Sequence, residues 1–419
     1  MAHNGAMTGP SDTAEIRRNN LALVLAAIDA QESCSRTTIR SATGLVSGSV
    51  SSLVDDLVTK GLVIESEAAA SGPGRPRRPL RVNPSRVVSV IVQLSRLDVI
   101  GEIRDFDGRI LWQQREVPAI RQGRADDLVA TLANMLSEAS DVAARLPDAW
   151  CTAPVIAMPS PVVGGRTAVV VLQFGLGRLE LADALAERLP GEPDPVIMNV
   201  GRLAAYGEYA AMPVGQRPQS MAYLATGTES IMGGLVIDGS TYLGSHMMAG
   251  ESGHISVAMD GPWCRCGVRG CLEFYLGLPG LLSNAGLGAY TERHALLDAV
   301  GEFAARLDAN DAQATAAIEQ AGAALASAIG TMSNWTDVEL IIIGGTIARF
   351  EQWLLPKVRE MLDMRSVNGP ESIPQIALAR FGEEAPRVGA WRLARQTVLD
   401  DPAQVPVMPP AGSAPDLTV

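Results

Sequence analysis

Long hydrophobic runs are missing from this chain of 419 residues, and no charged-then-apolar leader opens it. No stretch approaches the roughly 18 apolar residues that a membrane-spanning helix requires. We therefore expect neither a membrane protein nor a Sec-exported one, and we expect it to act in the cytoplasm. The composition, 47% hydrophobic and 19% charged, is that of an ordinary globular protein with enough material for several domains.

Cysteine is scarce, and its five residues exclude a disulfide-stapled scaffold. Three of them stand in a glycine-hinged run, Cys-Arg-Cys-Gly-Val-Arg-Gly-Cys, shortly after a histidine. Three thiolates and one imidazole satisfy tetrahedral Zn²⁺ and leave no position for a reactive water, so we predict a structural zinc. The alternative is a chance cluster of free thiols. The predicted ligands are His254, Cys264, Cys266 and Cys271.

Positively charged residues are fewer than negatively charged ones, but the imbalance differs along the chain. The net charge is −12, yet residues 1–90 carry ten Lys and Arg against eight Asp and Glu. A neutral-to-basic head on an acidic body indicates two different tasks. Overall acidity does not exclude DNA binding, because binding depends on the local patch.

The head has the pattern of three short helices and a two-stranded ribbon. Residues 1–15 have no apolar period and are predicted to be a flexible arm. The first helix is predicted to begin at about Ile16. Its apolar residues make one buried stripe, which consists of Leu21, Val24, Leu25 and Ile28. Ser35 and Gly44 are predicted to bound a second helix, and Ser47 to cap a third. Short strands follow at 62–64 and 79–82. We therefore predict a winged helix-turn-helix over 16–84.

Two parts of this head carry groups suited to DNA. The third helix presents small polar residues, which allow close approach to bases and phosphates. The ribbon tip, Gly-Pro-Gly-Arg-Pro-Arg-Arg over 72–78, holds arginines extended for a narrow minor groove. The alternative is a small helical dimerisation module with a basic loop. The residues predicted to contact double-stranded operator DNA are Arg36, Ser47, Ser49, Ser51, Ser52, Arg75, Arg77 and Arg78.

Beyond Pro84, strands and helices alternate. Three strands at 87–92, 99–104 and 109–113 recur as a second triplet, at 222–225, 233–237 and 241–243, with Asp-Gly at the same turn. This repeat predicts a duplicated α/β body with a cleft between its halves. We expect subdomains at 85–205 and 206–398, the last helix being free to return to the first subdomain, and a flexible tail at 399–419.

Taken together, these motifs resemble the ROK family (repressors, open reading frames and sugar kinases), in its regulator branch. Glu251-Ser-Gly-His254 matches the family's E-x-G-H, and Cys264 to Glu273 matches C-x-C-G-x-x-G-C-x-E. Gly227-Thr228, Ile343-Gly344-Gly345 and the Gly-Arg-Pro wing support the resemblance, which covers about 16–398. It implies the actin-like fold of hexokinases and heat-shock ATPases, a sugar held between the halves, and a homodimer or homotetramer with paired DNA-reading heads.

The chain departs from the family's kinases at three loops. Asn199-Val200-Gly201-Arg202 replaces Asn-Asp-Ala-Asn, and valine cannot accept the proton of a sugar hydroxyl. Gln93 to Leu97 replaces Asp-x-Gly-Gly-Thr, and Glu229 puts a carboxylate in the second phosphate loop. Loss of a general base alone costs ~10²–10⁴ in rate. We predict no kinase activity.

The resemblance also assigns an effector site. It implies that Glu251, His254 and Glu273 bond sugar hydroxyls, with Asn199 and Arg202 lining the same pocket. Arg202 would pair with a ligand's carboxylate or phosphate, or instead with Glu251. The alternative is that the two glutamates only support the zinc loop. The expected effector is a sugar, an amino sugar or a sugar phosphate.

Three functions follow from these patterns. The first is a ROK-type transcription regulator, with repression as the expected sign, controlled by a sugar-like effector. The second is an active sugar kinase with an added DNA-binding head. The third is a regulator that has lost its small ligand and responds to a protein partner.

Overall fold

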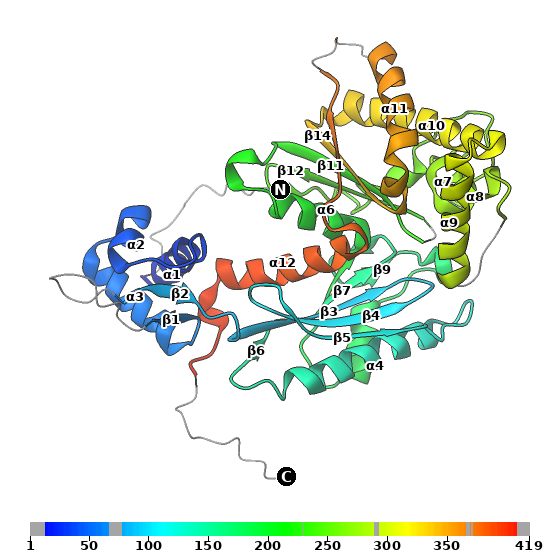
Figure 1. Cartoon of the computed structure of the whole chain (residues 1–419). Helices are drawn as coiled ribbons and strands as arrows, with labels where there is room; N and C mark the ends of the chain where they lie inside the picture. The colour runs from blue at the N-terminus through cyan, green and yellow to red at the C-terminus, as the bar shows by residue number, and fades with distance from the viewer. Residues whose placement is uncertain are drawn as a thin grey trace.

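The computed structural model of the protein describes residues 13–408, except 67–77, 229, 289–292, 366–368 and 370–371. A small head lies beside a body of two α/β lobes, and one long helix, α12 (Ala385–Asp400), runs from the body to the head (Figure 1). Within these described ranges, no helix has both the length and the apolar character needed to cross a bilayer.

The head is the expected helical unit with a two-stranded antiparallel ribbon. It consists of α1 (Thr13–Asp29), α2 (Arg36–Thr43), α3 (Ser47–Thr59), β1 (Val63–Glu65) and β2 (Leu80–Val82). The predicted stripe of α1 is buried, and the Ser35 side chain caps α2 by accepting from the Thr38 amide. Gly44 ends α2 in the left-handed conformation, with φ of 71°.

Three predictions about the head need correction or lie outside the described residues. Helix α1 begins at Thr13, inside the segment expected to be an arm. Ser47 does not cap α3: it is the first helical residue, because the extended residue before it is Val46, which has no side-chain cap. The ribbon tip, with Arg75 and Arg77, and residues 1–12 lie outside the described residues.

The first lobe is built on a sheet with strand order β10-β7-β3-β4-β5. Its main strands are β3 (Val87–Leu94), β4 (Val99–Asp105), β5 (Ile110–Glu116), β7 (Val155–Met158) and β10 (Val196–Asn199), and β6 (Trp150–Cys151), β8 (Val162–Val163) and β9 (Thr167–Ala168) are short. Helices α4 (Ala125–Ala143) and α5 (Leu181–Arg188) pack on one side of this sheet. Helices α6 (Val200–Ala210) and α12 pack against the core of strands β3 and β7.

The second lobe repeats the topology, with order β13-β12-β11-β14-β15. Its strands are β11 (Ser220–Thr226), β12 (Ile231–Ile237), β13 (Ser240–Thr241), β14 (Leu340–Gly345) and β15 (Gln375–Leu378), and its helices are α7 (Glu273–Leu276), α8 (Leu278–Asn284), α9 (Arg293–Asp308), α10 (Ala312–Thr336) and α11 (Glu351–Arg365). In both lobes three antiparallel strands are followed by two parallel ones, which confirms the predicted duplication. The last strand of the second triplet ends at Thr241, two residues earlier than expected.

The end of α12 and the segment after it dock on the head. Val398, Leu399 and Val405 belong to the head's own hydrophobic core. The Lys60 ammonium donates to the Ala403 carbonyl over 3.0 Å, and the Arg86 guanidinium to the Lys60 and Pro406 carbonyls, each over 2.7 Å. The prediction of a flexible tail from residue 399 is therefore wrong as far as residue 408, because apolar burial and these donors fix the segment. Residues 409–419 lie outside the described residues.

Candidate functional site

A pocket between the two lobes holds about 750 Å³ of empty space and opens to solvent. Its walls come from the end of β3 and the following turn, the start of α6, the loop after β11, and the start of α12. Its lining includes Gln93, Arg96, Val200, Thr228, Ser230 and Arg387.

The first of the three altered loops is tied to α12. The Arg387 guanidinium donates to the Gln93 side-chain oxygen over 3.0 Å and to Glu102 over 2.6 Å. Glu102 is fully buried and also accepts from Arg104 over 2.8 Å. Burial by itself raises the pKa of Glu102, but Arg387 and Arg104 bring it below its ordinary value. The buried Arg387, paired with Glu102, therefore holds Gln93 at the wall of the pocket.

At the start of α6, the side chain of Asn199 forms hydrogen bonds with backbone groups. Its side-chain oxygen accepts from the Gly201 and Arg202 amides at 2.8 and 3.3 Å, and its amide donates to the Ser160 carbonyl over 3.1 Å. Val200 lines the pocket next to it and offers no acceptor for a proton.

Arg202 is buried and bonds a loop rather than the pocket. Its guanidinium donates to the carbonyls of Met247 and Ala249, and the Nη2–O distance to Ala249 is 3.3 Å. Burial lowers the pKa of Arg202 and raises that of Glu251, and in each case the charge of the other residue opposes the shift. The backbone carbonyls are thus a partner for Arg202 that the sequence did not indicate.

Glu273 brings an unsatisfied polar atom to the same region. One carboxylate oxygen accepts from the Ile231 amide over 2.8 Å, whereas the other is buried and, among the described residues, has no partner. The hydroxyl of Ser252 is also buried, and it likewise has no hydrogen-bond partner among the described residues. Burial raises the pKa of Glu273 to about 7, against the effect of the Ile231 hydrogen bond. None of the five predicted effector residues lines the pocket between the lobes.

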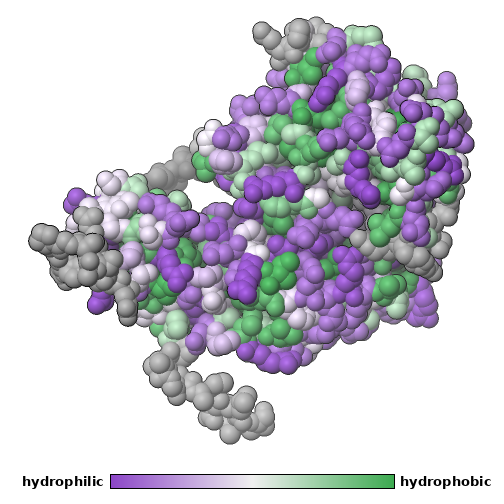
Figure 2. All heavy atoms as spheres, viewed as in Figure 1, coloured by the Kyte–Doolittle hydropathy of each residue, from purple (hydrophilic) through white to green (hydrophobic). Residues whose placement is uncertain are grey.

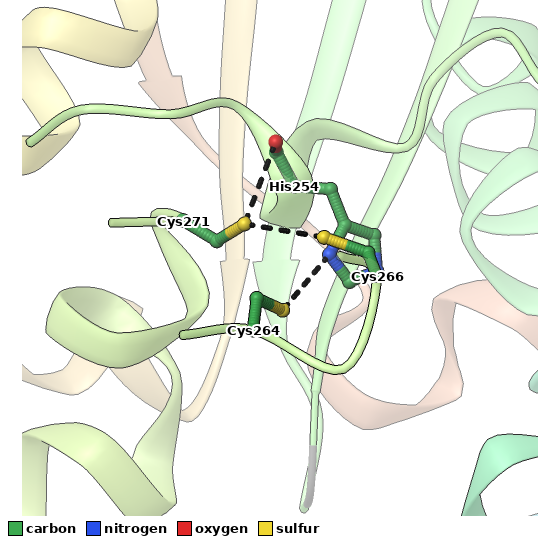
Figure 3. Close-up of side chains that lie close together, drawn as sticks. All are labelled: His254, Cys264, Cys266 and Cys271. Carbon is green, nitrogen blue, oxygen red and sulfur yellow. Dashed lines mark hydrogen bonds between the residues drawn. The ribbon is translucent and has the colours of Figure 1, made fainter. Parts of the chain in front are cut away.

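His254, Cys264, Cys266 and Cys271 converge on one point (Figure 3). The Cys264 sulfur lies 3.6 Å from Nδ1 of His254, the Cys266 and Cys271 sulfurs lie 3.5 Å apart, and all four atoms lie within 4.8 Å of one another. Ligand edges of about 3.7 Å follow from zinc–sulfur bonds of about 2.3 Å in a tetrahedron. The spacing is too long for a disulfide. The donor set and its geometry therefore fit a metal ion such as zinc.

The loop that carries these sulfurs depends on glycine. Gly267 and Gly270 have φ values of 96° and 65°, which favour glycine. A Cβ added to Gly270 would lie 1.7 Å from the Ala258 carbonyl oxygen. Burial lowers the pKa of His254, which favours the neutral imidazole that binds metals.

The predicted DNA-contacting residues fall into two groups. Ser47 and Ser52 are exposed and Ser49 and Ser51 are half-buried at the start of α3. Arg36 instead pairs with Asp55 at 2.9 Å and with Glu65 at 2.6 Å, and Arg78 lies 3.5 Å from Glu65. Arg36 and Arg78 thus form an ion cluster that ties α2 and α3 to the ribbon.

Sequence reasoning missed two arginines on this surface. Arg40 is exposed and its guanidinium donates to the Ser47 hydroxyl over 3.5 Å, at the start of α3. Arg17 of α1 donates to the Ser52 hydroxyl over 3.3 Å. The spacing of Arg36 and Arg40, four apart on one helix, was the available signal, since such residues share a face.

A family comparison covers most of the two lobes, but not the head. The model of the ROK family matches residues 98–397. The chain therefore belongs to the ROK family.

Solved structures extend the comparison to the head. A ROK family transcriptional regulator, described as a homolog of the E. coli MLC protein, superposes with a TM-score of 0.73 and 22% identity, over 92% of this chain and 97% of its own. A ROK family glucokinase from Streptomyces griseus, in complex with glucose and AMPPNP, gives 0.60 and 23% identity, over 74% of this chain and 99% of its own. At these identities the likeness shows a shared fold, which with the regulator covers nearly the whole chain.

Curated relatives include kinases. A glucokinase from Halalkalibacterium halodurans is 29% identical over 214 residues, which are 48% of this chain and 64% of the relative. An N-acetylmannosamine kinase from Haemophilus influenzae is 27% identical over 206 residues, 49% of this chain and 65% of the relative. The chain thus spans less than two thirds of the length of either.

Proposed function

We propose that the protein is a transcriptional regulator of the ROK family, with repression as the expected sign. It binds operator DNA through its winged head, responds to a sugar, amino-sugar or sugar-phosphate effector, acts in the cytoplasm and has no kinase activity. The observation that carries this proposal is the pair of substitutions at the pocket: Val200 in place of a proton acceptor, and Gln93 bonded to Arg387.

Two separate requirements of phosphoryl transfer, a proton acceptor at position 200 and an acidic residue for the metal at position 93, are missing from the pocket, which supports the absence of kinase activity. Such transfer depends on positioned metal ions and on charge stabilisation of the phosphates. Gln93 has no carboxylate to hold a metal, and Arg387 next to it already bonds buried Glu102, which it shares with Arg104. The alternative, an active sugar kinase with an added head, is favoured by the names of the curated relatives and of the superposed glucokinase.

The head supports the DNA-binding half of the proposal. The start of α3 is partly exposed and carries four serine hydroxyl groups, with Arg40 beside Ser47. Such groups position a helix against phosphates and base edges. Arg75 and Arg77 would add contacts from the ribbon tip. A homodimer or homotetramer would present paired heads to half-sites an integral number of turns apart.

The effector half rests on the two unpaired buried oxygens near the zinc loop. A buried acceptor and a buried hydroxyl without partners are costly, by about 1–3 kcal/mol each. A ligand rich in hydroxyl groups would satisfy both Ser252 and Glu273. In this proposal zinc, held by the three sulfurs and His254, has a structural role and fixes the segment from Glu251 to Glu273. Asn199 and Arg202 position this region through the backbone.

Three assays on the full chain test the proposal. ATP hydrolysis is measured with a panel of sugars, and no turnover above background is expected. Binding to genomic duplex fragments is then selected and quantified, with Ser49→Ala and Ser51→Ala expected to change the preferred sequence more than the general affinity. Sugar-dependent ATP turnover would establish the kinase alternative instead. A thermal-shift panel of sugars and sugar phosphates tests the effector, since a ligand must stabilise the fold it binds.

A further inference from the structure

The three sulfurs of the metal site differ in their access to solvent. Hydrophilic residues cover much of the face shown in Figure 2, so exposure by itself marks no site, but exposure of a reactive sulfur is different. Cys271 is fully buried and Cys264 is half-buried, whereas Cys266 is exposed. Residues 265–269 are all exposed with it. A small molecule from solvent therefore reaches the sulfur of Cys266 before it reaches the other two.

Cys266 and Cys271 also lie on backbone of different rigidity. Cys266 is inside a four-residue turn, which the Gly267 amide closes by donating to the Cys264 carbonyl over 3.0 Å. Cys271 instead forms an antiparallel bridge with Ser256, and its side chain belongs to the interior. An exposed turn moves more readily than a buried bridge, because fewer contacts have to be broken. We therefore expect Cys266 to be the residue that moves.

The two sulfurs are within a short movement of each other. Those of Cys266 and Cys271 lie 3.5 Å apart (Figure 3). A disulfide bond is about 2.0 Å long, so an approach of about 1.5 Å closes it. Cys264 is the poorer partner, since only Arg265 separates it from Cys266, and so small a ring strains the torsion angle of the bond. The Cys264 sulfur lies instead beside Nδ1 of His254, at 3.6 Å.

We propose that Cys266 and Cys271 form a site of reversible oxidation, at which hydrogen peroxide exchanges the bound metal for a disulfide bond. The Cys266 sulfur attacks one peroxide oxygen, the O–O bond breaks, and the departing hydroxide takes up a proton to become water. The Cys271 sulfur then attacks the sulfenic acid at Cys266. The S–S bond forms, the S–O bond breaks, and the second oxygen leaves as water with a second proton. Two thiolates thus supply the two electrons that reduce peroxide to two waters.

Oxidation removes two of the four metal ligands. His254 and Cys264 alone do not complete a tetrahedral site, so the site releases its metal. Glu273 follows Cys271 by two residues, and its unpaired carboxylate oxygen lies in the segment that the metal fixes. The inference rests on the metal site of the proposed function and adds an oxidant as a second signal to which the protein responds.

The test exposes the full chain to hydrogen peroxide and follows zinc release with a chromogenic chelator, against a sample without peroxide. Each cysteine is then mapped by alkylation and mass spectrometry. Trypsin cleaves after Arg265 and Arg269, so the three cysteines of the metal site fall in three different peptides. Cys34 and Cys151 are internal controls, because both lie outside the cluster.

We expect one zinc ion to be released per chain and two of the five thiols to be lost. A disulfide should link the peptide of residues 266–269 to that of 270–293, and reductant with added zinc should reverse both changes. The proposal is overturned if zinc and all five thiols persist. It is also overturned if Cys266 pairs with Cys264, or if Cys151 is oxidised before Cys266.

A matched pair of variants separates the disulfide from the metal. Cys264→Ser and Cys266→Ser each remove one ligand, but only Cys264→Ser keeps the proposed pair of sulfurs. Peroxide should join Cys266 to Cys271 in Cys264→Ser and leave the Cys271 thiol free in Cys266→Ser; equal loss of the Cys271 thiol in both would contradict the proposal. Elemental analysis before oxidation tests the structural metal by itself. Protein purified without zinc would refute that metal, while the mapped disulfide would still decide the oxidation site.

Discussion

Arg387, in the first turn of α12, donates a hydrogen bond of 3.0 Å to the side-chain oxygen of Gln93 on β3. The same guanidinium pairs with Glu102, which is fully buried. The pocket between the lobes is thus bounded by a buried ion cluster in which Arg387 and Arg104 share Glu102.

This arrangement predicts that a catalytic base alone does not restore kinase activity. Val200→Asp returns a carboxylate to the pocket, but the first loop still lacks its acidic residue. We expect ATP turnover by Val200→Asp with the sugar panel to equal that of the wild type in a coupled assay. A gain of tenfold or more would show that phosphate binding has been retained and that only the base was lost.

The Glu102 cluster predicts a particular dependence of stability on pH. The folded-state pKa of Glu102 is depressed, so its stabilising effect is present above its ordinary pKa and is lost as the pH falls through the folded value. Arg387→Met should cost about 3–5 kcal/mol at pH 7, because Glu102 stays buried with one cation fewer.

Denaturant unfolding at pH 7 and pH 4 measures this effect. The difference between Arg387→Met and the wild type should shrink at the lower pH, and Glu102→Gln combined with Arg387→Met should recover part of the loss at pH 7. A difference that is equal at both pH values would contradict the role assigned to Glu102.

The metal site predicts that Cys264→Ser or Cys266→Ser loses zinc and unfolds at a lower temperature. A structural site contributes its binding free energy to folding, so removal of one thiolate weakens both. Elemental analysis of the purified variants and their Tm values provide the measurement. Cys151→Ser is the control, since Cys151 lies outside the cluster, and it should keep its zinc. Wild-type protein that is free of metal and still binds DNA fully would refute the site.

The contacts of Arg36 and Arg40, both on α2, lead us to expect different roles for these two arginines. Arg40→Ala should weaken binding to all duplexes and lower the salt slope by about 1, as the loss of one phosphate contact does. Arg36→Ala should instead lower the stability of the head, because Arg36 pairs with Asp55 and Glu65. Salt-dependent binding and thermal unfolding of both variants separate these outcomes. Equal salt slopes for Arg40→Ala and the wild type would mean that DNA approaches another surface.

Much of the fold was predictable because its signals are local. The stripe of α1, the cap of α2, the repeated strand triplet and the spacing of the cysteines each span a short segment. The relationship of Gln93 to Arg387 was not predictable, because 294 positions separate the two residues and no period links them. The same reason explains the docked segment at 401–408: its proline-rich composition indicates a loose tail, whereas Lys60 and Arg86 of the head region supply its partners.

Site residues were harder to predict than elements. Residue types identify the metal ligands, because few other arrangements use three thiolates and an imidazole. The same reasoning leaves Arg202 open between a ligand and Glu251, since the sequence does not indicate that the carbonyls of Met247 and Ala249 lie within its reach.

The length of α12 has a mechanical consequence. Its 16 residues extend about 24 Å, with Arg387 near the pocket and Leu399 in the core of the head. A tilt of about 5° at the first end displaces the other by about 2 Å over that length. In a symmetric pair of subunits the two heads would shift in opposite directions, by about 4 Å in all, which exceeds the rise of about 3.4 Å per base step. If the protein binds DNA as the symmetric pair proposed above, small movements near Gln93 would therefore change the spacing of the two heads by about one base step.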